Sequence, residues 1–424
     1  MFKIALLVLF YFLFPLLIIY LCKRWTILQK VGSIVLAYGF GLILGTSGIL
    51  PKGSDGFKLA LQGRTTIPKT EMQNLLSAGK VTEADLWANH IANIQDMIPT
   101  VVVPLAFPLL LFSLNIKRWL KYAKKGFISV ALALIAGIVM VTAGFFIWKN
   151  SIPESWKLAG MFEGIYTGGT PNFVAIKMAL NLDPSLFVVV STYDMVVGAF
   201  LILFFITVAP KIFRFILPKF TEDKGISADA VDLTRETANL EDYSGMFKKS
   251  TLLPLLKALG ISLIIFAIGG ALSLALPMIP QMVVVILTIT TLGVVASLFK
   301  SINKIEKTFQ LGMYLILVFS LTVASMADLK AMLGIGMVNL ILFITWCYFG
   351  SLILHIILAK IFRIDADNFL ITSAAFIFSP PFVPLVANAL KNKDVIVTGI
   401  TGGLLGYILG NYFGVGLAYF LKGF

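Results

Sequence analysis

The hydrophobic positions of this chain gather in long apolar runs with few charges. Each run has about 20 residues or more, the length at which a helix crosses the hydrocarbon of a bilayer. The pattern therefore predicts about 11 to 12 membrane-spanning helices. The apolar runs cover residues 4–22, 31–50, 97–116, 126–148, 156–181, 185–210, 251–276, 281–299, 308–327, 334–361, 367–390 and 395–421.

Two polar stretches interrupt the apolar runs. Residues 51–96 mix Lys, Asp and Glu, which indicates an excursion outside the membrane with an amphipathic helix near Ala84 to Ile94. Residues 218–250 form a polar linker that divides the chain near its middle. We therefore expect an N-terminal half, residues 1–217, and a C-terminal half, residues 251–424.

Composition supports an all-α polytopic membrane protein. The chain has 424 residues, is 58% hydrophobic and 13% charged, and has a mean hydropathy of +0.94, unlike a soluble domain. Its net charge of +13 comes from basic clusters at helix ends, such as residues 117–125, which fits topology signals rather than nucleic-acid binding. We expect a multi-pass protein of the cell (inner or cytoplasmic) membrane. Cys22 and Cys347 lie in apolar runs and indicate neither disulfides nor a metal cluster.

The two halves share one feature, an apolar run broken by Gly or Pro. The broken runs are 156–181, with GGTPNFVAIKMAL, and 367–390, with FSPPFVPLVANAL. Paired interruptions at corresponding positions are typical of transporters built from repeats, with the binding site where the two discontinuous helices cross. The basic clusters at 23–30 and 117–125 fall on the opposite side from those at 300–307 and 360–363 in a plain segment count, so we expect inverted repeats.

The interruptions supply most of the candidate substrate- and ion-binding residues. Freed carbonyls and helix ends at such breaks can bind a coupling ion or an anionic group, whereas a proline kink packed against a neighbour is the structural alternative. The first break offers Gly168, Gly169, Thr170, Pro171 and Asn172, and the second offers Ser379, Pro380, Pro381 and Asn388.

Two acidic residues in apolar runs are further candidates. Asp194, beside Tyr193, is the strongest single candidate because a carboxylate within the membrane is costly and usually functional. Glu163, which precedes the first break, is the second candidate for binding an ion. The alternative is that its carboxylate faces an aqueous mouth and is solvated. We expect a sodium ion, if one binds, near Thr170, Asn172, Asp194 and Ser379.

The last run carries small residues at four-residue spacing. Gly402, Gly406, Gly410 and Gly414 permit close helix packing, which we expect against a broken helix, with homodimerisation as the lesser alternative. Asn411 lies beside this stripe and either reaches the site or joins helices.

Two regions resemble a known family. YTGGTPNFVAIKMAL with STYDMVVGAFLILFF is similar to the domain-of-unknown-function 819 membrane family, in which a Gly-Gly-Ser/Thr-x-Asn run precedes a helix with an Asp-Asn pair. Met195 replaces that Asn, and Ser379-Pro380 stands where the family's second break has two glycines. The family looks distantly similar to bile acid:sodium symporters and sodium/proton antiporters. That resemblance implies crossing broken helices in a core domain that moves against a panel domain, and a sodium site at Gly168 to Asn172.

These patterns predict a cation-coupled secondary transporter of a small solute, driven by Na⁺ or H⁺. Small anions are among the candidate solutes. No Walker loop, Rossmann fingerprint or zincin motif is present in the sequence, so we expect neither an enzyme nor a cofactor beyond the coupling ion. The expected partners are the lipid bilayer and the transported solute or ion, without nucleic acid. A monovalent cation/proton antiporter and a non-transporting scaffold or sensor are the alternatives.

Overall fold

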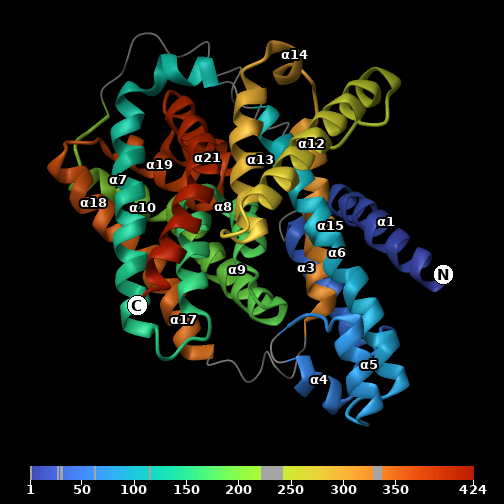
Figure 1. The fold of residues 1–424 in the computed structure, drawn as a ribbon. Coiled ribbons are helices and arrows are strands. Elements are labelled where there is room, and N and C mark those ends of the chain that lie inside the picture. Colours follow the sequence, from blue (N-terminus) through green and yellow to red (C-terminus); the bar gives the residue numbers. More distant parts are fainter. Residues whose placement is uncertain are drawn as a thin grey trace. The chain divides into compact units, whose positions relative to one another are not determined.

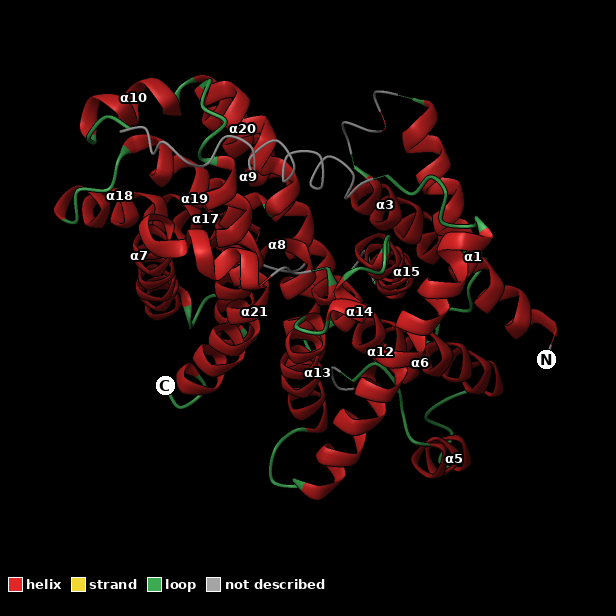
Figure 2. Ribbon diagram, turned by 90° about the horizontal axis from the view of Figure 1, so that it is seen from above, coloured by secondary structure: helices red, strands yellow, loops and turns green. Residues whose placement is uncertain are grey.

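The protein is an all-α polytopic membrane protein (Figures 1 and 2). The computed structural model describes residues 2–25, 28, 32–61, 64–113, 116–220, 242–327 and 337–424, and these residues contain helices and connecting loops but no strand. The predicted linker at 218–250 falls largely on residues 221–241, outside the described ranges.

The chain forms two compact units that alternate along the sequence. The first comprises Met1–Ala106, Asn181–Thr192 and Met313–Ile335, and the second comprises Phe107–Leu180, Tyr193–Gly312 and Gly336–Phe424. This division follows compactness rather than sequence halves, so the predicted repeat halves remain a prediction.

The helices of the N-terminal third are α1 (Phe2–Arg24), α3 (Ser33–Thr46), α4 (Asp55–Leu61), α5 (Lys69–Ser77) and α6 (Glu83–Phe112). They are followed by α7 (Ile116–Trp148), α8 (Ser155–Leu180), α9 (Pro184–Thr207), α10 (Ala209–Ile216), α12 (Lys249–Ala275), α13 (Gln281–Ser297), α14 (Lys300–Asn303) and α15 (Thr308–Met326). The last elements are α17 (Met337–Thr345), the π-helical η2 (Trp346–Gly350), α18 (Ser351–Ile361), α19 (Ala366–Phe378), the 3₁₀ turn η3 (Pro380–Phe382), α20 (Val383–Leu390) and α21 (Ile396–Leu421).

Within the described residues, every predicted apolar run corresponds to a helix or to consecutive helices. In the described part of the chain, eight helices are long and apolar enough to cross a membrane, and four apolar helices are shorter. One boundary prediction was wrong: the amphipathic helix expected near Ala84 to Ile94 and the run at 97–116 form the single helix α6. The helix continues through Pro99, Pro104 and Pro108, so neither the prolines nor the change from polar to apolar residues ends it.

The first unit is held together by a buried polar contact between three helices. Gln95 of α6 donates hydrogen bonds to the Tyr11 hydroxyl of α1, at 2.8 Å, and to the Ser325 hydroxyl of α15, at 2.9 Å. The two hydroxyls also bond each other at 2.6 Å. In an apolar surrounding, such a closed network fixes the register of the three helices because each group depends on the other two.

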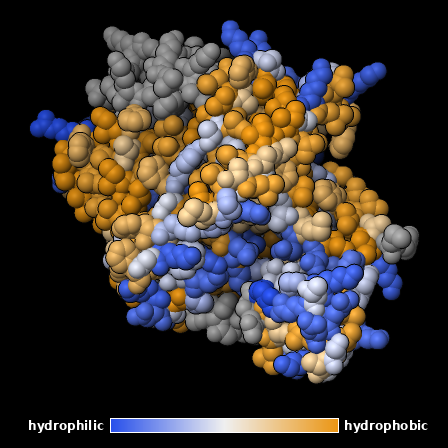
Figure 3. All heavy atoms as spheres, in the orientation of Figure 1, coloured by the Kyte–Doolittle hydropathy of each residue, from blue (hydrophilic) through white to orange (hydrophobic). Residues whose placement is uncertain are grey.

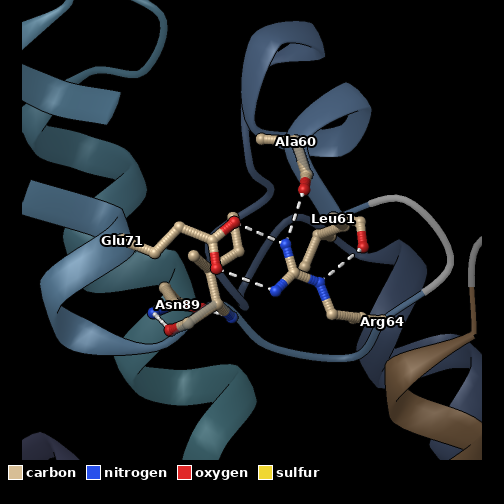
Figure 4. Close-up of polar contacts among 6 residues, drawn as sticks. Ala60, Leu61, Arg64, Glu71 and Asn89 are labelled. Atoms are coloured by element: carbon tan, nitrogen blue, oxygen red, sulfur yellow. Dashed lines mark hydrogen bonds and ion pairs between the residues drawn. The ribbon is translucent and has the colours of Figure 1, made fainter. Parts of the chain in front are cut away.

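The polar stretch 51–96 folds into a small helical subdomain around Phe57, Ile67, Met72 and Val81. Figure 4 shows the Arg64 guanidinium between the carboxylate of Glu71, at 2.6 and 2.8 Å, and the carbonyls of Ala60 and Leu61. Hydrophilic residues are frequent over α4 and α5 in Figure 3, mixed with apolar ones, whereas the surface over α7 and α18 is broadly apolar. This contrast agrees with an excursion outside the membrane.

In the second unit, α21 packs along α8 and α19 (Figure 2). Glycines make this contact close: an ideal Cβ placed on Gly406 would lie 2.7 Å from the carbonyl carbon of Thr167 in α8. Gly410 and Gly414 likewise face the backbone of α8, whereas Gly402 faces Val130 of α7. The predicted packing of this stripe against a broken helix is therefore confirmed for three of its four positions.

Candidate functional site

The backbone of α8 leaves the helical conformation at Gly169. Its φ of 65° and ψ of −158° lie in a region that is essentially reserved for glycine, so α8 consists of two helical segments that meet there. Pro171 lacks an amide hydrogen and stands at the start of the second segment, where no intrahelical donor is needed. Gly168 and Pro171 are buried, and Thr170 is half-buried.

The second interruption lies at Ser379. Helix α19 ends at Phe378, Ser379 has φ 74° and ψ 164°, and Pro380 and Pro381 then form the 3₁₀ turn that leads into α20. For a residue with a Cβ this backbone conformation costs about 1–3 kcal/mol, so surrounding contacts must hold it. Pro380 is buried and Pro381 is half-buried.

The two interruptions touch each other. An ideal Cβ on Gly169 would lie 3.2 Å from the Cβ of Ser379 and would collide with its hydroxyl oxygen. Helix α21 completes the contact, since the Tyr407 hydroxyl hydrogen-bonds Ser379 and Gly403 lies against the ring of Pro380. Two breaks about 210 residues apart in sequence are thus brought together.

Asn172 supplies an unpaired polar atom next to the first interruption. Its side chain is fully buried, and its Nδ2 donates to the carbonyl oxygen of Gly406 at 2.8 Å. Its Oδ1 has no hydrogen-bond partner. A buried acceptor without a partner is costly, which makes Oδ1 a natural contact for a donor group or a cation.

The other predicted amides lie elsewhere. Asn411 is buried on α21 and donates to the Thr290 hydroxyl of α13 at 2.9 Å, so it joins these two helices, while its Oδ1 is unpaired. Asn388 is exposed on α20. The structure therefore brings Asn172, but not Asn388, to the interruptions.

Asp194 belongs to a second polar cluster. The Tyr348 hydroxyl donates a hydrogen bond to Asp194 Oδ1, and across the described residues Asp194 forms no hydrogen bond with either interruption. Tyr348 lies in η2, a five-residue π-helical segment, and π-helical segments are frequent at functional sites. Tyr193, next to Asp194, is half-buried.

Glu163 lies in the first segment of α8 and is fully buried. Neither of its carboxyl oxygens has a hydrogen-bond partner. The predicted alternative of a solvated mouth does not describe this position, because no part of the side chain is exposed.

The described part of the chain does not bring together the acidic, His and Cys side chains that commonly bind a metal ion. No group of three or more His, Cys, Asp and Glu side chains lies close enough to hold a metal ion there. Of the four residues predicted around sodium, Asn172 and Ser379 both lie against α21 at the interruptions, and Asp194 is bonded to Tyr348. A sodium site there stays a prediction.

A groove of about 530 Å³ lies between α7 and the helices α17 and α18. Its lining is apolar and includes Trp148, Trp346 and Phe349, and it contains none of the predicted site residues. Because an apolar wall offers no partner to a charged solute, we do not assign this groove to the site.

Sequence reasoning missed Tyr348 and Tyr407. Both are buried tyrosines in apolar runs, and each hydroxyl contacts a predicted site residue. Buried tyrosines usually find a polar partner, so their presence in membrane runs was the available signal. The partner itself depends on tertiary contacts that the sequence pattern does not reveal.

Comparison with known proteins agrees with this architecture. The model of the family described as "Protein of unknown function (DUF819)" matches residues 74–424.

The chain belongs to the DUF819 family.

The DUF819 match includes both interruptions, Asp194 and η2. A similar protein is the "Uncharacterized membrane protein YjcL" of Bacillus subtilis (strain 168), 25% identical over 347 residues that cover 76% of this chain and 82% of that protein. Membership in DUF819 thus agrees with the family resemblance inferred from the residues around 166–205 and 378–421.

Proposed function

We propose that this protein is a cation-coupled secondary transporter of a small solute that works by alternating access. The observation that carries the proposal is the contact between the two interruptions at Gly169 and Ser379, packed against α21. Paired breaks in membrane helices free backbone groups that must be satisfied inside the protein, and transporters use such groups to bind solute and ion.

Two further features support this proposal. The unpaired Oδ1 of Asn172 offers an acceptor beside the contact, and the carboxyl groups of Glu163 and Asp194 offer sites for a coupling cation in the same compact unit. The sequence lacks nucleotide-binding motifs, so an ion gradient is the energy source that fits.

The test is solute and ion flux in proteoliposomes. Purified protein is reconstituted and screened with radiolabelled amino acids, carboxylates and nucleosides under an inward sodium gradient or an inward proton gradient. Asn172→Ala and Asp194→Asn are compared with wild type, and Asn74→Ala, on the exposed face of α5, is the matched control. We expect the first two variants to lose at least about tenfold in rate, equivalent to about 1.4 kcal/mol, while both still unfold cooperatively in detergent above the assay temperature.

Unchanged rates in Asn172→Ala and Asp194→Asn, in a wild-type protein that transports, would contradict the assignment of the site. Failure of the wild type to move any tested solute or ion would favour a scaffold or sensor.

A cation/proton antiporter is the second candidate function. Two acidic side chains in the membrane part of one compact unit, Glu163 and Asp194, favour it. A pH change inside sealed proteoliposomes on addition of sodium or potassium, without any solute, would identify this activity.

A further inference from the structure

Glu163 is a buried carboxyl group without a partner in the protein. It is fully buried, both of its oxygens lack hydrogen bonds, and no basic side chain in the described ranges forms an ion pair with it. An isolated carboxylate in an apolar interior is strongly disfavoured, and such groups are compensated by a bound cation or by a proton. We therefore expect Glu163 to bind either a cation or a proton.

The carboxyl group of Glu163 packs closely against α7. Gly137 of α7 faces it, and an ideal Cβ there would lie 2.9 Å from Glu163 Oε2 and 2.8 Å from the Tyr166 ring. The ring of Phe162, the neighbouring residue, packs edge-on against Phe343 of α17, with centroids 5.6 Å apart. Any side chain at position 137 would therefore collide with Glu163 and Tyr166, and this close packing leaves less space for a hydrated cation than for a proton.

The titratable groups near Glu163 are acidic or neutral. Tyr166 on its own helix and Cys347 on η2 both interact electrostatically with it. The Tyr166 hydroxyl is also without a partner. Tyr348 is the next residue after Cys347. The ring centroids of Tyr348 and Tyr166 are 6.5 Å apart, and the Tyr348 hydroxyl donates a hydrogen bond to Asp194. Segment η2 therefore connects the surroundings of Glu163 with those of Asp194.

This donor set suits a proton better than a sodium ion. Hard cations such as sodium need several oxygen ligands arranged around them, whereas a proton needs one oxygen. At Glu163 the only oxygen atoms that the described contacts supply are its own two carboxyl oxygens, and its surroundings include a glycine, an aromatic ring and a thiol. The interruptions, with Asn172, Ser379 and Tyr407, offer more oxygen atoms for an ion or solute.

We propose that Glu163 binds the proton that is coupled to transport, and that Asp194 with Tyr348 is the neighbouring acidic group that exchanges with it. This inference rests on the proposed transport function and names its coupling ion. Glu163 lies six residues before Gly169 on the same helical segment. Movement of this segment at the interruption therefore changes the surroundings of the carboxyl group, which is how solute binding and proton binding become linked.

The first test detects the proton directly and does not depend on transport. Infrared difference spectra between neutral and alkaline pH, recorded on purified protein in lipid, show the C=O stretch of a protonated carboxylic acid. We expect a band at the high frequency of an acid without strong hydrogen bonds, absent in Glu163→Gln and retained in Glu71→Gln, the control in the subdomain outside the membrane. A spectrum of Glu163→Gln identical to that of wild type would overturn the proposal.

The second measurement uses the wild-type protein and so does not depend on folding of a variant. Dicyclohexylcarbodiimide adds to protonated carboxylic acids in membranes, and mass spectrometry locates the adduct. We expect the adduct at Glu163 and not at the exposed, ion-paired Glu71. Adducts at other acidic residues with Glu163 unmodified would count against the proposal.

The third test concerns coupling. In proteoliposomes that transport solute, Glu163→Gln should remove the response to a pH gradient while solute exchange between equal pools continues. A response equal to that of wild type would overturn the coupling role, although transport itself would stand. Absence of any flux in the wild type would refute the proposed function and the coupling role together, and the infrared band would still report whether Glu163 holds a proton.

Discussion

The contact between the two interruptions can be tested by a double-mutant cycle of Gly169→Ala and Ser379→Gly. In Gly169→Ala the new Cβ occupies a backbone conformation that costs about 1–3 kcal/mol. It also collides with the hydroxyl oxygen of Ser379, and such overpacking adds about 1–3 kcal/mol. We therefore expect Gly169→Ala to destabilise the protein by about 2–6 kcal/mol.

The partner substitution, Ser379→Gly, has stabilising and destabilising effects that oppose each other. Ser379→Gly relieves backbone strain of about 1–3 kcal/mol at φ 74°. It loses the hydrogen bond with Tyr407, about 0.5–1.5 kcal/mol, and adds unfolded-state entropy of about 0.5–1 kcal/mol. The net change is therefore centred near zero and lies between about 1.5 kcal/mol of destabilisation and about 2 kcal/mol of stabilisation.

The double variant separates strain from contact. Removing the Ser379 side chain abolishes the collision but leaves the backbone strain at position 169, so the double variant should be less destabilised than the sum of the singles by about 1–3 kcal/mol. The assay is equilibrium unfolding in mixed detergent micelles, followed by intrinsic tryptophan fluorescence. Effects that add within about 0.5 kcal/mol would refute direct contact between the interruptions.

Two further predictions concern ion pairs. Arg214 of α10 binds Asp367 of α19 through two hydrogen bonds of 2.8 and 2.9 Å, and the side chain of Asp367 is 5% exposed whereas that of Arg214 is 44% exposed. Arg214→Ala should therefore lower the melting temperature in detergent more than Asp367→Asn does, because it leaves the buried carboxylate without its partner. Equal losses of melting temperature would contradict this prediction. Hydrogen bonds from Ser244, and then Lys307, lower the pKa of Asp242 to about 2, so its stabilising effect is complete above the ordinary aspartate pKa of about 3.9 and lost as pH falls toward the lowered value. Asp242→Asn should lower the melting temperature equally from about pH 5 to pH 8, and a difference that varies over this interval would count against the assignment.

The apolar runs predicted the helices well because a bilayer imposes length and apolarity on every crossing segment. The interruptions were also located from Gly and Pro, since GGTPN and FSPPF are costly within a helix. The left-handed φ of Ser379 was not predictable, because neighbouring contacts rather than local preference hold it.

The composition of the site was predicted only in part. Asp194 was identified from the cost of a carboxylate in an apolar run, but its partner Tyr348 is 154 residues away and lies in a π-helical segment that has no simple sequence signal. The continuity of α6 was missed because a change from polar to apolar residues looks like a boundary although the backbone needs none.

The helices on either side of the second interruption are short compared with the thickness of a bilayer. The thirteen residues of α19 extend about 20 Å at about 1.5 Å per residue, less than the roughly 30 Å of hydrocarbon. Neither α19 nor the shorter α20, with eight residues, is therefore long enough to cross the hydrocarbon alone. Because α19 and α20 are separate short helices joined through Ser379 and the turn η3, a change of backbone conformation at this junction can alter the direction of one helix without bending the other.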